Sequence, residues 1–486
     1  MQDTDRTILG RRVTRRRFLT IAGTSAVAVA VTQPLFSSQA LAAPLTRFDV
    51  GGLTATSPTI KSFIAGIKAM RMLPKTDPTS WQYQAAIHGY APITSSPPTA
   101  WGTCQHGNEF FWSWHRMYLY WFERIVRKKS GDSSWTIPFW AWDSPSELQI
   151  PALFREKKKL PTLYSVNRLP AMNAGAMLTA VETSTTSAFM ATSFWTGTGS
   201  GAVEQFSYPH NHVHVAVGAG FADPTVTALD PLFWLHHSNC DRLWEAWRGS
   251  SGGSDPTSDL GWTGKTWTFF DENGKAVTMS DCDVVNAAQQ LKYRYQGGPT
   301  LAVEMCPNLV ARMLPHFAVF PLSISIPPLG AQPVRVPLQI PADARQKLMN
   351  IAADPSKTVY LHLEDVTAPT QPGAVWAAFV GPPSAPSAAV LSGAQPADAQ
   401  DPYFVGAVSL FVNGVQDEMD MRAQVALPLN KALLASRNAS TLEITFVTQG
   451  VMLNGVQVRP QVRASVNIGK ATILVETHTA GNAKSQ

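Results

Sequence analysis

Cysteine and charge are both scarce in this sequence. Only four of the 486 residues are cysteines, and no two of them form a Cys-x-x-Cys pair. So few cysteines in so long a chain do not predict a disulfide-built scaffold, and the missing pair argues against a zinc ribbon or a thioredoxin-like site. Charged residues make up 15% of the chain and apolar residues 45%, which is typical of a globular protein with a large core.

A basic surface is also lacking outside the N-terminus. The net charge is +5, but residues 1–42 hold six arginines, two aspartates and no lysine, which leaves about +1 for all the rest. We therefore expect no nucleic-acid partner.

The N-terminus has the pattern of an export signal. Thr14–Thr20 reads TRRRFLT, an apolar stretch follows over 21–31, and Ala40-Leu41-Ala42 resembles a cleavage site. We predict a twin-arginine signal peptide over 1–42 and a periplasmic or secreted protein; the alternative is a flexible basic tail. The apolar stretch is too short to span a bilayer, and no other segment is long enough, so no stable membrane anchoring is expected.

Tryptophan divides the chain in two. Fourteen of the fifteen tryptophans lie at or before Trp267, in a region with helix signals. Residues 109–128 predict a buried helix, and Asp230-Pro231 predicts the start of another. From about 305 onward, short alternating runs predict the strands of an all-β domain, at 359–364, 403–412, 442–447 and 471–476. The Pro/Ala/Ser-rich stretch 381–400 predicts a loop or linker.

Histidines gather in the tryptophan-rich region. Eight of the eleven lie there: His88, His106, His115, His210, His212, His214, His236 and His237. Unpaired buried imidazoles are costly, and a shared metal ion would offset that cost, so we expect metal ligands among them.

Spacing sorts these histidines. His210 and His214 are four apart and share one helical face, whereas His212 between them points elsewhere. His237 lies one turn before Asp241, and we expect the Asp241 carboxylate to hydrogen-bond the His237 ring and fix its tautomer.

The earlier histidines come from separate elements. His106 and His115 are nine apart and cannot face one ion from one helix, so His106 should lie in the loop before the helix of His115. His88 should come from an earlier helix around 81–87. Two sets of three imidazoles without a carboxylate favour a copper pair over a zinc hydrolase site or a facial-triad iron site.

Two histidine motifs resemble those of tyrosinases and catechol oxidases. Cys104-x-His106 with Phe111–Arg116 (FWSWHR) and Glu123 resembles the first copper-binding region of that family. The stretches PHNHVH (209–214) and DPLFWLHHSNCD (230–241) resemble the second. In that family the last ligand is the histidine followed by three residues and Asp, which selects His237 over His236.

The resemblance implies the layout of the whole chain. It implies a mainly α dicopper domain with a four-helix-bundle core at 43–262, and a segment at 263–300 that resembles the middle region of plant polyphenol oxidases. A β-rich C-terminal domain at 301–486, sandwich- or barrel-like, would follow and act as a lid in a latent enzyme. The cysteine-rich N-terminal region of the plant enzymes, with its two disulfides, is missing.

The resemblance also implies the cofactors. Two copper ions, CuA and CuB, would bind O2 between them as a bridging peroxide. The implied ligands are His88, His106 and His115 for CuA, and His210, His214 and His237 for CuB. A thioether between Cys104 and His106 would modify one ligand, as in some family members.

The implied activity is oxidation of small o-diphenols to o-quinones with O2, together with hydroxylation of monophenols. For hydroxylation, the family's device is a water held by a Glu and by the Asn after the first CuB histidine, which are Glu204 and Asn211 here. The phenylalanine that covers CuA in plant enzymes corresponds to Pro224, with Phe221 nearby. A copper chaperone is a conceivable partner. The alternatives are a diphenol-only catechol oxidase, an oxygen carrier of the haemocyanin kind and a zinc hydrolase.

Overall fold

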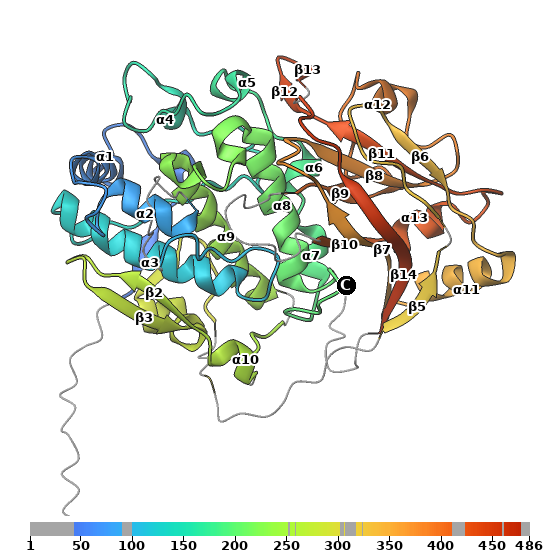
Figure 1. Ribbon diagram of the computed structural model, residues 1–486, viewed down its shortest axis with the longest axis horizontal. Coiled ribbons are helices and arrows are strands. Elements are labelled where there is room, and N and C mark those ends of the chain that lie inside the picture. The colour runs from blue at the N-terminus through green and yellow to red at the C-terminus, as the bar shows by residue number, and fades with distance from the viewer. Residues whose placement is uncertain are drawn as a thin grey trace, which may run out of the picture. The chain divides into compact units, whose positions relative to one another are not determined.

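Helices dominate the first half of the described chain and strands dominate the second (Figure 1). The computed structural model describes residues 43–89, 100–250, 253–257, 259–301, 306, 317–322, 324–410, 423–458 and 461–477. The predicted signal peptide, 1–42, lies outside these residues. Within them, no helix has the length and apolar character needed to cross a membrane.

The described helices include several short turns. The α-helices are α1 (Pro58–Arg71), α2 (Trp81–His88), α3 (Phe111–Ser130), α4 (Ala152–Arg155), α5 (Pro170–Asn173), α6 (Ala180–Thr183), α7 (Thr186–Met190), α8 (Ala202–Val217), α9 (Pro231–Ser250), α10 (Leu260–Thr263), α11 (Ala342–Ala352), α12 (Ala388–Ser392) and α13 (Asn430–Ala435). The remaining turns are η1 (Val50–Gly52), η2 (Ala219–Ala222), η3 (Thr227–Leu229), η4 (Asp281–Val284) and η5 (Ala287–Leu291).

Strands pair into two four-stranded antiparallel sheets and three small two-stranded ones. One large sheet has the order β10-β7-β14-β5 and the other β6-β11-β8-β9; the pairs are β1-β4 (parallel), β2-β3 and β12-β13. The strands are β1 (Leu45–Arg47), β2 (Thr266–Phe270), β3 (Ala276–Ser280), β4 (Tyr293–Tyr295), β5 (Phe317–Pro321), β6 (Val334–Pro337), β7 (Lys357–Thr367), β8 (Val375–Gly381), β9 (Phe404–Val408), β10 (Ala423–Pro428), β11 (Glu443–Gln449), β12 (Val451–Leu453), β13 (Val456–Val458) and β14 (Asn467–Thr477).

The two long predicted helices are confirmed, each with a recognisable end. Helix α3 is buried on most of its circumference and ends at Gly131, whose φ of +76° suits a residue without a side chain. Helix α9 begins at Pro231, and Asp230 Oδ1 accepts a hydrogen bond from Leu232 N at 2.9 Å, as an N-cap should. Helix α3 packs against α1 and α9.

The predicted strands at 359–364, 442–447 and 471–476 are confirmed as parts of β7, β11 and β14; of the run 403–412, residues 404–408 form β9, and 411–412 lie outside the described residues. One core takes side chains from both large sheets, including Leu361, Ile473, Trp376 and Phe446. Residues 381–400 are not a linker between domains, because they connect β8 to its neighbour β9 and contain α12. The four-helix-bundle core and the sandwich- or barrel-like closure stay predictions.

A disulfide joins Cys282, in η4, to Cys306, 24 positions later. The low cysteine count gave no expectation of this pair. The other two cysteines, Cys104 and Cys240, are buried free thiols. The disulfide closes the segment that links the helical part to the β-rich part.

Candidate metal centre

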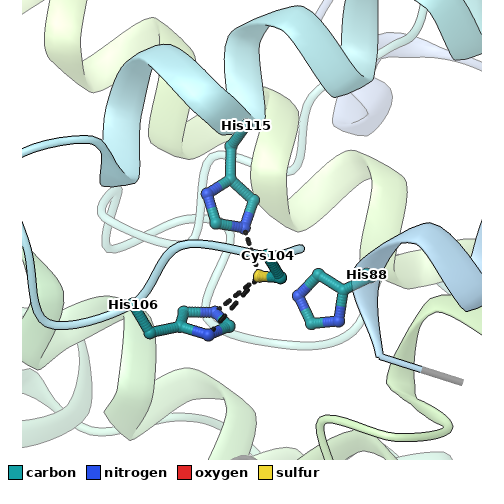
Figure 2. A group of neighbouring side chains, drawn as sticks. All are labelled: His88, Cys104, His106 and His115. Carbon is teal, nitrogen blue, oxygen red and sulfur yellow. Dashed lines mark hydrogen bonds between the residues drawn. The ribbon is translucent and has the colours of Figure 1, made fainter. Parts of the chain in front are cut away.

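The first histidine group comes from two helices and the loop between them. His88 ends α2, His115 lies in the second turn of α3, and His106 lies in the loop before α3, as predicted. Figure 2 shows all three side chains converging on Cys104. One ligand atom from each of these four residues lies within 4.8 Å of the others, which is close enough to surround one ion.

The second group comes from α8 and α9. His210 and His214 share one face of α8, and α9 contributes His236 and His237. These four residues meet the same 4.8 Å limit. His237 Nε2 lies 3.4 Å from His214 Nε2, so these two nitrogens point at one position.

The two groups face each other. The rings of His115 and His237 stack with centroids 4.3 Å apart and planes within 5° of parallel. The rings of His106 and His210 lie 5.6 Å apart. Two ions held by the two groups would therefore be neighbours, able to act on one small molecule.

Burial keeps these imidazoles neutral. Desolvation lowers the pKa of His88 to about 4. It also lowers the pKa values of the other histidines of both groups well below the usual range, and neighbouring histidines add to the effect. A neutral imidazole offers the lone pair that a metal ion needs.

Hydrogen bonds fix which ring nitrogen faces inward. Nδ1 of His88, His115 and His214 each lies 2.7–3.1 Å from a main-chain carbonyl oxygen, which can only accept. In each of these rings, Nδ1 therefore carries the proton and Nε2 keeps its lone pair. Nε2 of His88 is buried and has no hydrogen-bond partner among the described residues. This is the arrangement expected of metal ligands.

The donor set fits copper. It consists of neutral imidazoles with one thiol, and no carboxylate belongs to either group. Imidazole suits copper and zinc, but a hydrolytic zinc site often adds a carboxylate ligand and needs a positioned Glu base. The first group contains the predicted ligands His88, His106 and His115, and the second contains His210, His214 and His237 together with His236, so the choice of ligands stays a prediction.

The predicted contact between Asp241 and His237 is wrong. Asp241 accepts hydrogen bonds from Arg116, Arg47 and the hydroxyls of Tyr293 and Tyr295, at 2.5–3.0 Å. His237 Nδ1 has no hydrogen-bond partner among the described residues. Burial alone would raise the pKa of Asp241, but the two guanidinium groups outweigh it and lower that pKa. Asp241 therefore holds buried arginine and tyrosine side chains together and does not orient His237.

Glu204 and Asn211 bond to different partners. Both oxygens of Glu204 accept hydrogen bonds from the preceding loop, from the backbone N–H groups of Thr196, Gly199 and Gly201 and from the Thr196 hydroxyl. Among the described residues, no hydrogen bond joins Glu204 to Asn211. Glu204 thus caps α8, and its predicted role in holding a water with Asn211 stays a prediction.

Asn211 lies beside the second group. Its Oδ1 lies 2.9 Å from His210 Nδ1, so it accepts the proton of that ring and turns Nε2 inward. Asn211 is half-buried, whereas His210 and His214 on the same helix are buried.

Cys104 lies against the imidazole of His106. Its Sγ is 3.4 Å from both Nδ1 and Nε2 of that ring, the two nitrogens that flank Cε1 (Figure 2). Burial raises the pKa of the Cys104 thiol well above its usual value, which disfavours a thiolate ligand. Cys104 is therefore better suited to modifying a ligand than to being one.

Sequence reasoning missed a phenylalanine between the two groups. The ring of Phe233 lies 4.3 Å from that of His237 and 4.8 Å from that of His88. The spacing of four to His237 on α9 was the available signal. Phe221 packs on His214 at 4.8 Å, and Pro224 reaches His88 through its carbonyl oxygen rather than by covering it.

Two family models match this chain over the regions just described. Residues 78–168 and 161–250 match the "Common central domain of tyrosinase", and residues 257–305 match the "Polyphenol oxidase middle domain". The first match contains both histidine groups, and the second contains the segment around η4.

Individual relatives agree with these matches. The chain is 32% identical over 285 residues to tyrosinase HcTyr1 of Hahella sp. and 29% identical over 322 residues to polyphenol oxidase II of Ipomoea batatas. The matches cover 49% and 54% of this chain, and only 60% and 53% of the relatives.

Solved structures share the fold over a longer stretch. Latent aurone synthase (a polyphenol oxidase) matches with a TM-score of 0.62 at 20% identity, over 90% of each chain. Latent apple tyrosinase matches with a TM-score of 0.61 at 19% identity, over 90% of this chain and 98% of its own.

Fold and site together show two facing groups of histidines, each able to surround one metal ion, and a β-rich C-terminal part. The family matches agree with this: residues 78–250 carry a tyrosinase central domain, followed at 257–305 by a polyphenol oxidase middle domain.

Proposed function

We propose that this protein is a copper-dependent phenol oxidase, which oxidises o-diphenols to o-quinones with O2 and also hydroxylates monophenols. The observation that supports this most strongly is the pair of facing groups of neutral histidines without a carboxylate. The names tyrosinase and polyphenol oxidase among the relatives agree with it. In the diphenol reaction, two diphenols give up four electrons and four protons, and one O2 becomes two waters.

The residues of the site have separate tasks. His88, His106 and His115 would hold one copper ion, and His210, His214 and His237 the other. Bound copper would supply the redox chemistry and the O2 site. We infer that His237, not His236, is the ligand, because its Nε2 approaches His214 Nε2 and its ring stacks on His115. Phe233 offers an apolar ring beside both groups for packing a phenol.

The direct test is O2 uptake by the copper-loaded protein, residues 43–486, on addition of 4-tert-butylcatechol. We expect uptake with copper and none with zinc or in a His210→Ala variant. Reversible O2 binding without turnover would instead indicate an oxygen carrier. Two tightly held zinc ions with hydrolytic activity would indicate a hydrolase.

We infer that Asn211, without Glu204, orients the water that takes the phenol proton during hydroxylation. Its contact with His210 and its partial exposure support this role. Asn211→Asp should change the ratio of monophenol to diphenol rates, whereas Asn167→Asp, an exposed change of the same chemistry, should not. An unchanged ratio in Asn211→Asp would contradict this role of Asn211. The protein would then either oxidise diphenols only or use another group to take the phenol proton.

We also propose a thioether between Cys104 Sγ and Cε1 of His106. The equal distances from Sγ to the two flanking nitrogens support it. One S–H and one C–H bond break, an S–C bond forms, and O2 takes up the two electrons and two protons. Denatured protein should be lighter by two hydrogen atoms than the Cys282–Cys306 disulfide accounts for, and an alkylatable Cys104 would contradict the bond.

The remaining proposals concern the rest of the chain. We propose export by the twin-arginine route under the direction of residues 1–42. We propose that the β-rich part, 301–486, is a lid that limits activity in the full-length chain. Hydrogen bonds between α8 and β10 support the lid, because α8 also carries His210 and His214.

A further inference from the structure

One short segment supplies a main-chain acceptor to both histidine groups. It runs from 218 to 227, between the end of α8 and the start of η3. The carbonyl oxygen of Phe221 accepts from His214 Nδ1 at 2.8 Å, in the second group. Only three residues later, the carbonyl oxygen of Pro224 accepts from His88 Nδ1 at 3.1 Å, in the first group. The same stretch of backbone thus sets the tautomer of one predicted ligand for each ion.

Thr227 holds the end of this segment that serves the second group. Its side chain is fully buried, and its hydroxyl donates to the carbonyl oxygen of Phe221 at 2.9 Å. The same oxygen atom, Oγ1, lies 3.3 Å from His214 Nδ1. The hydroxyl therefore contacts both partners of the hydrogen bond that orients His214.

Gly89 serves the first group by having no side chain. It follows His88 directly at the end of α2. A Cβ atom at this position would lie 2.8 Å from the carbonyl oxygen of Pro224, closer than real Cβ contacts. Any larger residue would push away the oxygen that His88 needs.

We propose that residues 218–227 form a positioning segment shared by both metal sites, with Thr227 as the positioning residue for the second site and Gly89 for the first. Neither residue is a ligand, and each acts through the carbonyl oxygen that orients a ligand. The inference rests on the proposed function, because it takes each group to hold one ion. Losing such an outer partner commonly weakens metal binding roughly 10- to 100-fold.

The test is site-selective loss of metal affinity. Metal-free protein would be titrated with Cu(I) or Co(II) against a competing chelator, and the visible absorption of Co(II) would report the geometry of each site. We expect Thr227→Val to weaken one of the two ions roughly 10- to 100-fold, and Thr227→Ser to restore it. Thr225→Val is the matched control, since within the described part of the chain the Thr225 hydroxyl donates to Asp223 and to neither histidine group. Gly89→Ala should weaken the other ion.

The outcomes separate this inference from the proposed function. Parental affinity for both ions in Thr227→Val and Gly89→Ala, even with a lower unfolding midpoint, would show a structural role only and overturn the inference. A parent protein that bound fewer than two ions would overturn the proposed function and the inference with it. If Thr227→Val does not fold, Thr227→Ala, which also lacks the hydroxyl, carries the same test.

Discussion

The cost of a buried imidazole depends on pH. Folded His88 has a pKa lowered to about 4, and unfolded His88 should titrate near its ordinary value of 6.5. Between these two values the unfolded chain binds a proton that the folded chain does not. The stability of the metal-free protein should therefore fall as the pH falls through this window, by about 1.4 kcal/mol per pH unit for each such histidine.

This acid sensitivity can be measured by urea unfolding of metal-free protein between pH 7.5 and 4.5. His212 is a suitable probe, since burial lowers its pKa to about 3 although it is not a predicted ligand. His212→Phe should reduce the slope of the free energy of unfolding against pH by about 1.4 kcal/mol per pH unit, because one fewer proton is taken up on unfolding. An unchanged pH dependence would mean that His212 is protonated in the folded protein.

His212 and His210 should differ in their effect on metal content. His212 is buried outside both histidine groups and hydrogen-bonds the backbone of Val181, whereas His210 belongs to the second group. His212→Ala should keep two ions per chain and lose roughly 1 to 3 kcal/mol of stability. His210→Ala should lose one ion. Metal analysis of the two purified variants decides the question, and equal metal loss would contradict the assignment.

At the scale of elements, the Cys282–Cys306 disulfide should stabilise the segment that links the helical part to the β-rich part. Closing a loop of this length should stabilise the fold by about 3 kcal/mol. The double variant Cys282→Ser/Cys306→Ser should unfold several degrees lower than the parent. A reducing agent should lower the unfolding temperature of the parent but not of the double variant. If neither treatment shifts it, the pair does not constrain the unfolded chain.

Local patterns predicted the elements well, and contacts between distant residues much less well. The spacing of His210 and His214, the cap at Asp230 and the alternation in β7 each depend on neighbours in the sequence, so each was readable. The carbonyl oxygens of Phe221 and Pro224 carry no side-chain signal, and therefore the shared acceptor segment was not foreseen.

Competition for partners also limited the prediction. Asp241 is one turn from His237, but two arginines and two tyrosines from distant segments occupy its oxygens instead. The Glu204 carboxylate likewise accepts hydrogen bonds from the loop before α8. Sequence spacing can show that two groups are within reach, but not which of several partners each one takes.

At the scale of the whole molecule, α8 links the histidines to the β-rich part. Strand β10 is the edge of its sheet, and α8 side chains bond its backbone. Ala426 N donates to the Tyr208 hydroxyl at 3.0 Å, and Gln205 Nε2 donates to the carbonyl oxygen of Ala426 at 2.8 Å. Weakening this contact should loosen the proposed lid.

Tyr208→Phe tests the lid without touching the metal ligands. The change leaves the Ala426 N–H without its acceptor, which costs roughly 1 to 3 kcal/mol at the contact. We expect the variant to reach full phenol oxidase activity at a lower detergent or protease concentration than the parent. Tyr120→Phe, which removes a hydroxyl bonded to Arg124, is the control. A full-length parent that is already fully active would contradict the lid.

Strand β1, near the start of the chain, pairs with a strand that is made much later, and it contacts the helix of His237. Its residues, Leu45–Arg47, pair in parallel with Tyr293–Tyr295, and the Arg47 guanidinium is buried against Asp241 on the helix of His237. The strand pairing joins positions 248 residues apart, and the contact of Arg47 with Asp241 joins positions 194 apart. On the ribosome, the first strand must wait until its partner emerges, after all eight histidines of the helical part have been made. We therefore expect the helix of His237 to reach its final packing only after the helical half has been translated.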